Sequence, residues 1–234
     1  RMQKMQPEQH MSQEDEARMF LLHAHAALAL LGAAAMRYAE QAEAMACDTT
    51  LSMNTRTRMA DVSASLCRIA SGRPTCLRDA MQLMWLYALA SGALNYGRMD
   101  VYLGDFLEAD LTAGRLTPVT AQEMITSLWK LVAERNTVYN GRIILGGRGR
   151  RNPEQADAFA KLAMEATRVT PGSDPQLTLR WHKGMSPALL DQALSILGEG
   201  RTFPILYNDD INIPAVAARS EERRVGEECR CRWW

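Results

Sequence analysis

Three short apolar segments in the last part of the chain constrain its fold most strongly. They are "RIILG" (142–146), "QLTLRW" (176–181) and "FPILY" (203–207), and each has β-branched or aromatic residues, which favour strands. The intervening segments "PEQADAFAKLAMEATR" and "PALLDQALSILGEG" have helical periodicity. Strands joined through helices by short links form parallel sheets. The sequence therefore predicts an α/β fold with a βαβαβ arrangement.

The helix boundaries in this part have clear signals. Asn152-Pro153 and Ser186-Pro187 each supply a helix-capping residue followed by a proline suited to the first helical position. We therefore expect both helices to begin at these prolines.

Residues 14 to about 140 are expected to be helical throughout and to form a layer that precedes the strands. We expect Thr75 to cap one helix, Gly114 to end another, and Thr120 with Glu123 to form a capping box. The expected helices cover residues 14–46, 50–70, 76–96, 97–114 and 121–136.

Composition and charge exclude several classes of protein. Lys+Arg and Asp+Glu balance at 27 each, so no net charge attracts nucleic acid. The most apolar run, residues 19–36, contains two histidines and many alanines. We expect it to be a buried helix rather than a membrane span or a signal peptide. Cys47, Cys67 and Cys76 share no metal-ligand spacing, which indicates reduced thiols, no metal site and a cytoplasmic protein.

Polar loops follow each predicted strand: "GGRGRRN", "HKGMS" and "NDDINIP". Active sites of parallel sheets lie at the carboxyl ends of the strands, where these loops meet. Asp209 and Asp210 are candidates for an acid, a base or a metal ligand. They are equally candidates for capping the next turn or for pairing with Arg180 on the neighbouring strand. His182 has no sequence neighbour of matching chemistry.

The glycine-rich loop after the first predicted strand has two interpretations. One is a phosphate-binding or nucleotide-binding loop, which the setting between a strand and a helix allows. The third glycine of the dinucleotide pattern is replaced by Asn152. The favoured interpretation is a tight turn through Gly147 and Gly149, with the arginines solvated or paired with another domain.

The last sixteen residues, 219–234, differ from the rest of the chain. They have no apolar periodicity, and "RSEERRVGEEC" resembles a translated sequencing adapter. We expect this tail to be non-native and assign no function to its cysteines, Cys229 and Cys231. The predicted domain is residues 1–218, with a helical part over 1–140 and the first strands over 141–218.

Residues 26–216 resemble the pyruvate formate-lyase family of glycyl radical enzymes, also called formate acetyltransferases. The most specific segments are "NYGRMDVYLGDF" and "PILYNDDINIP", and the "GRIILGGRGRRNP" segment also matches. The matching motif residues are Gly97, Arg98, Asp100, Gly146 and Gly147. The resemblance implies a ten-stranded α/β barrel built from two parallel half-sheets, of which this chain would form part.

The resemblance also implies radical chemistry. Such enzymes carry a glycyl radical, which is installed by an iron–sulfur activating enzyme that uses S-adenosylmethionine. The radical is passed to a cysteine, and the resulting thiyl radical takes a hydrogen atom from a small substrate. The chain has no cysteine between Cys76 and Cys229. We therefore expect the thiyl cysteine and the radical glycine to lie beyond residue 218, and the chain as given to be inactive. The intact protein is expected to be a homodimer of anaerobic metabolism.

The substrate pocket is expected to draw on six residues: Tyr139, Asn140, Arg180, Asn208, Asp209 and Asp210. Pyruvate cleavage is one activity that the resemblance implies, and dehydratases, decarboxylases and C–N lyases share the scaffold. Two alternatives from other classes stay open. One is a phosphate-binding or nucleotide-binding α/β protein that uses the "GGRGRR" loop. The other is a non-catalytic helical scaffold.

Overall fold

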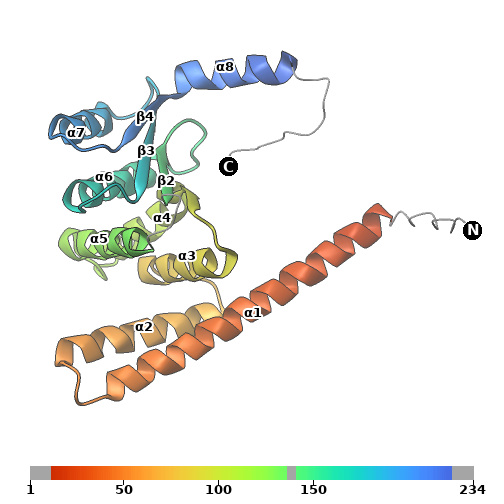
Figure 1. Cartoon of the computed structure of the whole chain (residues 1–234), viewed down its shortest axis with the longest axis vertical. Coiled ribbons are helices and arrows are strands. Elements are labelled where there is room, and N and C mark those ends of the chain that lie inside the picture. The colour runs from red at the N-terminus through yellow and green to blue at the C-terminus, as the bar shows by residue number, and fades with distance from the viewer. Residues whose placement is uncertain (1–11, 136–140, 223–234) are drawn as a thin grey trace, which may run out of the picture. The chain divides into compact units, whose positions relative to one another are not determined.

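The computed structural model describes residues 12–135 and 141–222 and is drawn in Figure 1. The chain divides into two compact units, Arg1–Arg73 and Pro74–Trp234. The predicted domain limits at residues 140 and 218 stay predictions, and residue 218 lies inside the last described helix.

The first unit is a helical hairpin of α1 (Gln13–Cys47) and α2 (Met53–Ser71). Each helix is capped by the serine that precedes it, Ser12 or Ser52. The serine hydroxyl accepts a hydrogen bond from a backbone N–H of the first turn. The two helices approach closely at Gly32, where an added Cβ would lie 2.7 Å from the carbonyl oxygen of Ala70. The two helices predicted over residues 14–46 and 50–70 are confirmed.

Burial in α1 differs from the expectation. The buried residues of this helix are Ala35, Ala39 and Ala42. Large apolar side chains in its first half are exposed within the unit, including Phe20, which is 69% exposed. The prediction that the run 19–36 is buried is therefore wrong for this unit. The helix has a mean hydropathy of 1.7 over its most apolar window and is long enough to cross a membrane, a test that core helices and signal sequences also pass.

The second unit contains a four-stranded parallel sheet with the order β1-β2-β3-β4. The three predicted strands are confirmed as β2, β3 and β4, and the α/β fold with them. The elements are α3 (Leu77–Ser91), β1 (Asn95–Arg98), α4 (Met99–Thr112), α5 (Pro118–Glu134), β2 (Arg142–Gly146), α6 (Pro153–Val169), β3 (Gln176–Trp181), α7 (Pro187–Gly198), β4 (Ile205–Asn208) and α8 (Asp209–Glu222).

The expectation of helix throughout residues 14–140 is wrong at β1. Helix α3 ends at Ser91 because Gly92 adopts a left-handed conformation with φ +70°. The chain then forms β1, which pairs with β2 in parallel. Helix α4 begins directly after Arg98, so the helix expected from residue 97 starts two residues later.

Alternation along the strands divides the sheet into two faces. Ile143, Leu145, Leu177 and Leu179 are fully buried, and they join the core formed with the helices, which includes Trp129. Helices α5, α6 and α7 lie along one side of the strands in Figure 1. This side of the sheet is therefore the covered one.

The helix starts in this unit are capped differently from the expectation. The capping box of α5 is formed by Thr117 and Thr120, with Pro118 at the first helical position, so the prediction of Thr120 with Glu123 is wrong. Helix α3 has Cys76 at its cap, and the Thr75 hydroxyl instead donates to Asp79 at 3.0 Å.

Helices α6 and α7 begin at the predicted prolines. Asn152 and Ser186 occupy the N-cap positions, but neither side chain makes a capping hydrogen bond. The Asn152 amide instead donates to the carbonyl oxygen of Val101 at 3.0 Å and to the carboxylate of Asp105. Asn152 therefore joins α4 to the start of α6. Gly114 ends α4 with φ +66°, as predicted.

Candidate functional site

The carboxyl ends of the four strands lie together because all four are parallel. We call this region the carboxyl edge and define it as residues 98–100, 146–152, 180–185 and 208–210. It contains the polar loops singled out from the sequence. It is the position at which open α/β sheets generally bind their ligands.

Asp209 is a buried carboxylate at the end of β4. One oxygen accepts from Arg180 Nε at 2.8 Å, and the other accepts from Arg180 Nη2 at 2.9 Å and from the Arg148 backbone N–H at 2.8 Å. Arg180 and Tyr207 are register partners on β3 and β4, which brings the two side chains together. The pairing of Asp209 with Arg180 is thus the alternative that the structure shows.

Asp210 makes a second set of contacts. Its Oδ1 accepts from Arg148 Nε at 2.9 Å, and its Oδ2 accepts from the Lys183 backbone N–H at 3.0 Å. These hydrogen bonds, with that from Lys183 the larger, lower the pKa of Asp210. Asp209 and Asp210 together connect the loops that follow β2, β3 and β4.

The glycine-rich loop after β2 is a tight turn. Gly146 and Gly147 have φ +73° and +87°, and an added Cβ at Gly147 would lie 2.8 Å from Asp209 Oδ2. The Arg98 guanidinium donates to the carbonyl oxygens of Gly146 at 2.7 Å and Arg148 at 3.1 Å. The loop is therefore held by Arg98 from β1 and lies against Asp209, the residue that follows β4.

The arginines of this loop pair inside the unit. Arg150 is 3% exposed, forms an ion pair with Asp157, and lies 3.7 Å from Asp100. Arg151 pairs with Asp105 at 3.0 Å. The expectation that the arginines of this loop are solvated or bound to another domain is wrong for Arg150, which is buried between α4 and α6. The Arg151 side chain is 69% exposed and is therefore solvated as expected.

Asp100 is the second residue of α4 and is fully buried. One oxygen accepts from the Gly146 N–H at 2.7 Å, and the other accepts from the Val101 N–H at 3.0 Å. Burial raises the pKa of Asp100 to about 6, against the opposing effects of these hydrogen bonds, Arg150 and Arg98. Asp100 thus links the start of α4 to the end of β2 through a carboxylate that is costly to ionise.

This burial predicts a pH-dependent stability. The folded-state pKa of about 6 exceeds the ordinary 3.8, so the folded chain binds this proton more tightly than the unfolded chain. Asp100 therefore lowers the free energy of unfolding as the pH rises from about 4 to 6, by on the order of 3 kcal/mol.

Asp100→Asn removes this titration. The free energy of unfolding of the wild type minus that of the variant should therefore fall by about 3 kcal/mol between about pH 4 and 7. Urea unfolding at closely spaced pH values measures it. A difference that stays constant over that range contradicts the assignment.

The remaining predicted site residues have mixed outcomes. Tyr139 and Asn140 lie outside the described residues. Asn208 ends β4, and its Oδ1 accepts from the Asp210 N–H at 3.0 Å. His182, which the sequence left isolated, accepts a hydrogen bond at Nδ1 from the Gly184 backbone N–H at 3.0 Å. The sequence feature that could have pointed to His182 is its position directly after β3, in a loop at the carboxyl edge.

Metal binding has no structural support in the part of the chain that is described. Within residues 12–135 and 141–222, no three His, Cys, Asp or Glu side chains are grouped to hold an ion. The carboxylates of Asp209 and Asp210 are instead engaged by arginines and backbone amides.

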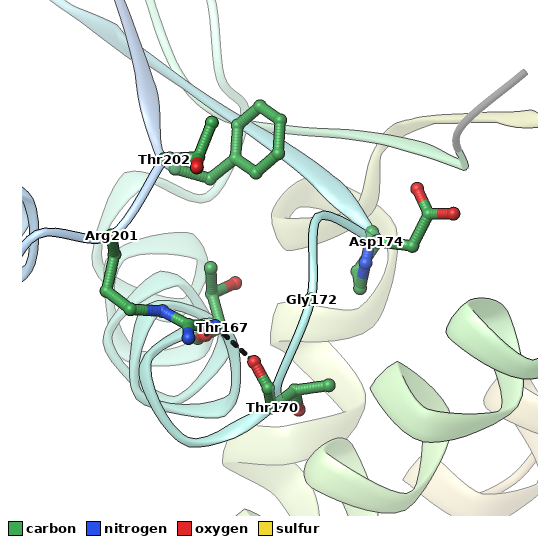
Figure 2. A pocket seen from close by; sticks show the side chains of 8 residues that line it. Thr167, Thr170, Gly172, Asp174, Arg201 and Thr202 are labelled. Atoms are coloured by element: carbon green, nitrogen blue, oxygen red, sulfur yellow. Dashed lines mark hydrogen bonds between the residues drawn. The ribbon is translucent and has the colours of Figure 1, made fainter.

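A small cavity lies at the opposite end of the strands, around the connections that enter β3 and β4. Figure 2 shows Arg201 reaching across it to the backbone carbonyl oxygen of Thr170. Its volume of about 10 Å³ has room for one water molecule and is far below that of a substrate pocket. Burial raises the pKa of Asp174 on its rim. We assign this cavity to packing at the base of the sheet.

The sequence matches the family model described as pyruvate formate lyase-like over residues 1–230. The chain belongs to this family. The match includes most of the tail expected to be non-native, and that expectation stays a prediction. The family's solved structures share the fold. A glycyl radical enzyme from Archaeoglobus fulgidus aligns with a TM-score of 0.69 and 20% identity over 81% of this chain and 27% of its own.

Two other relatives carry more specific descriptions. An isethionate sulfite-lyase from Nitratidesulfovibrio vulgaris is 24% identical over 70% of this chain and 23% of its own length. A structure concerned with 1,2-propanediol dehydration in Roseburia inulinivorans has a TM-score of 0.66 and 26% identity, covering 81% of this chain and 26% of its own.

The probable dehydratase YbiW of Escherichia coli is 27% identical over 62% of this chain and 21% of its own length. The chain thus spans about a quarter of the length of the relatives that it matches. Three of these four proteins are described by a lyase or a dehydration activity.

Proposed function

We propose that this chain is part of a glycyl radical enzyme that eliminates a leaving group from a small oxygen-bearing substrate. The observation that carries this proposal is the family match over residues 1–230. The activities named for the relatives are isethionate sulfite-lyase, probable dehydratase and 1,2-propanediol dehydration, and they favour elimination. Formate acetyltransferase activity is the second candidate, supported by the family description alone.

The carboxyl edge would form one wall of the substrate pocket. Arg180 and Asn208 are its candidate lining residues, and Tyr139 and Asn140, which precede β2 in the sequence, stay candidates for another part of the pocket. Asp209 and Asp210 would hold the start of the segment that follows β4, where the resemblance expects the thiyl cysteine. That cysteine and the radical glycine would lie outside residues 1–218.

The partners follow from the same proposal. The intact enzyme would work in the cytoplasm of an anaerobic cell, as a homodimer. An iron–sulfur activating enzyme that uses S-adenosylmethionine would install its glycyl radical. The glycyl radical would supply the hydrogen-abstracting chemistry, while the described residues would orient the substrate and exclude water.

The experiment uses the product of the complete reading frame, treated without oxygen with S-adenosylmethionine and its activating enzyme. Electron paramagnetic resonance should show a glycyl radical doublet. The activated enzyme is then offered 1,2-propanediol, glycerol, isethionate, and pyruvate with coenzyme A. Aldehyde or sulfite formation supports elimination, formation of acetyl-coenzyme A supports the second candidate, and absence of the radical refutes both.

A further inference from the structure

The charged side chains of the carboxyl edge are largely committed to one another. Arg180 uses Nε and Nη2 for Asp209, and the two oxygens of Asp210 accept from the Arg148 guanidinium and from the Lys183 backbone N–H. Such groups hold loops together, and using them for a substrate would require breaking these pairs. A substrate-binding group at this edge is therefore better sought among side chains with an unused donor.

His182 is such a side chain. It directly follows β3 and is half-buried. Its Nδ1 accepts a hydrogen bond from the Gly184 backbone N–H at 3.0 Å. An accepting Nδ1 requires the proton of the neutral ring to be on Nε2. No described residue accepts a hydrogen bond from this Nε2–H.

The loop around His182 fixes the ring. The Lys183 N–H donates to Asp210 at 3.0 Å, and the Met185 N–H donates to the His182 carbonyl oxygen at 3.0 Å. Gly184 lies against the ring, since an added Cβ would be 3.1 Å from Cε1 and 3.2 Å from Nδ1 of His182. A side chain that its own loop holds in place in this way loses little conformational entropy when it binds a ligand.

We propose that the Nε2–H of His182 is a substrate-binding hydrogen-bond donor at the carboxyl edge. This rests on the proposed function and adds a residue to it. The ligand class is a small molecule with a hydroxyl, carboxylate or sulfonate oxygen. The role is orientation, because loss of the proton from a neutral imidazole would leave an unfavourable anion.

The tautomer is tested on the chain itself. Long-range ¹H–¹⁵N correlation spectra at about pH 8 should show His182 with an unprotonated Nδ1 and a protonated Nε2. Gly184→Ala should displace the ring and change these signals, while the far-ultraviolet circular dichroism stays unchanged. A protonated Nδ1 in the wild type would overturn the proposal whether or not the chain belongs to an active enzyme.

The binding role is tested in the activated enzyme made from the complete reading frame. His182→Ala should raise KM about tenfold, the worth of one neutral hydrogen bond, with kcat changed less. His182→Gln should restore most of the affinity, because its amide places a donor near the Nε2 position. Radical content, read by electron paramagnetic resonance, should be unchanged in both variants.

His25→Ala, on α1, is the matched control and should leave KM unchanged. A His182→Ala enzyme that keeps its KM within about twofold overturns the proposal. A wild type without a glycyl radical refutes the proposed function, and the tautomer spectra then decide the inference by themselves.

Discussion

Replacing Asp209 by alanine should lower the free energy of unfolding of the second unit by about 3 kcal/mol. The variant leaves Arg180 without its carboxylate partner and leaves the Arg148 N–H without an acceptor. The loss lies at the lower end for a broken buried pair, because the Arg180 side chain is 22% exposed. Urea unfolding followed by tryptophan fluorescence measures it, since the described tryptophans Trp85, Trp129 and Trp181 all lie in this unit.

The matched control breaks an exposed ion pair of the same unit. Glu199 lies 3.4 Å from Arg168, and both side chains are more than 40% exposed. Glu199→Ala should therefore cost less than about 1 kcal/mol. Equal losses in the two variants would show that the burial of Asp209 contributes nothing.

Gly146→Ala should have a comparable or larger effect. The added Cβ would lie 2.5 Å from the carbonyl oxygen of Arg180 and 2.9 Å from Cε of Met185, and the residue has φ +73°. The nearest atom, the carbonyl oxygen of Arg180, belongs to the backbone, so no change of side-chain rotamer relieves this contact. Left-handed strain and overpacking together should cost about 3 kcal/mol or more.

Gly149 separates these two causes within the same loop. Its φ is +72°, and an added Cβ there would have no atom within 4 Å. Gly149→Ala therefore carries the conformational cost alone, about 1 kcal/mol. The difference between the two variants, measured by urea unfolding, isolates the close approach of Gly146 to β3. No difference between them would contradict this packing.

Hydrophobic periodicity and residue type were sufficient to predict most of the helices and strands of the second unit. Strands β2 and β3 lie where "RIILG" and "QLTLRW" predicted them, because β-branched centres between turn residues mark short buried strands. Strand β4 begins two residues after the predicted position, since Phe203 and Pro204 precede the ladder. Parallel pairing followed from the helices between them.

Strand β1 could not be predicted in the same way. Its four residues, "NYGR", are too few to show alternation, and Gly97 has φ +63°. Pairing with β2 makes it a strand, which is a tertiary effect. The start of α5 was mispredicted for a local reason. Pro118 already marked Thr117 as the cap, and the Thr120–Glu123 pattern competed with that signal.

The candidate site was predicted in part. The approach of Asp209 to Arg180 followed from two polar residues ending adjacent parallel strands, although the sequence did not favour it over capping. The partners of Arg150 were beyond prediction, because Asp100 and Asp157 come from separate helices that only the fold brings together. His182 was left aside because its contact with Gly184 depends on the conformation of the loop.

The contacts of Asp209 and Asp210 have a practical consequence for protein engineering. Arg148 lies in the loop after β2, Arg180 on β3 and Lys183 in the loop after β3, yet all three bond to this one pair of residues. Grafting a single loop from a relative would remove partners from the others. Exchange of specificity between family members should therefore succeed when the loops after β2, β3 and β4 are transplanted as one cassette, and individual swaps should show strong epistasis.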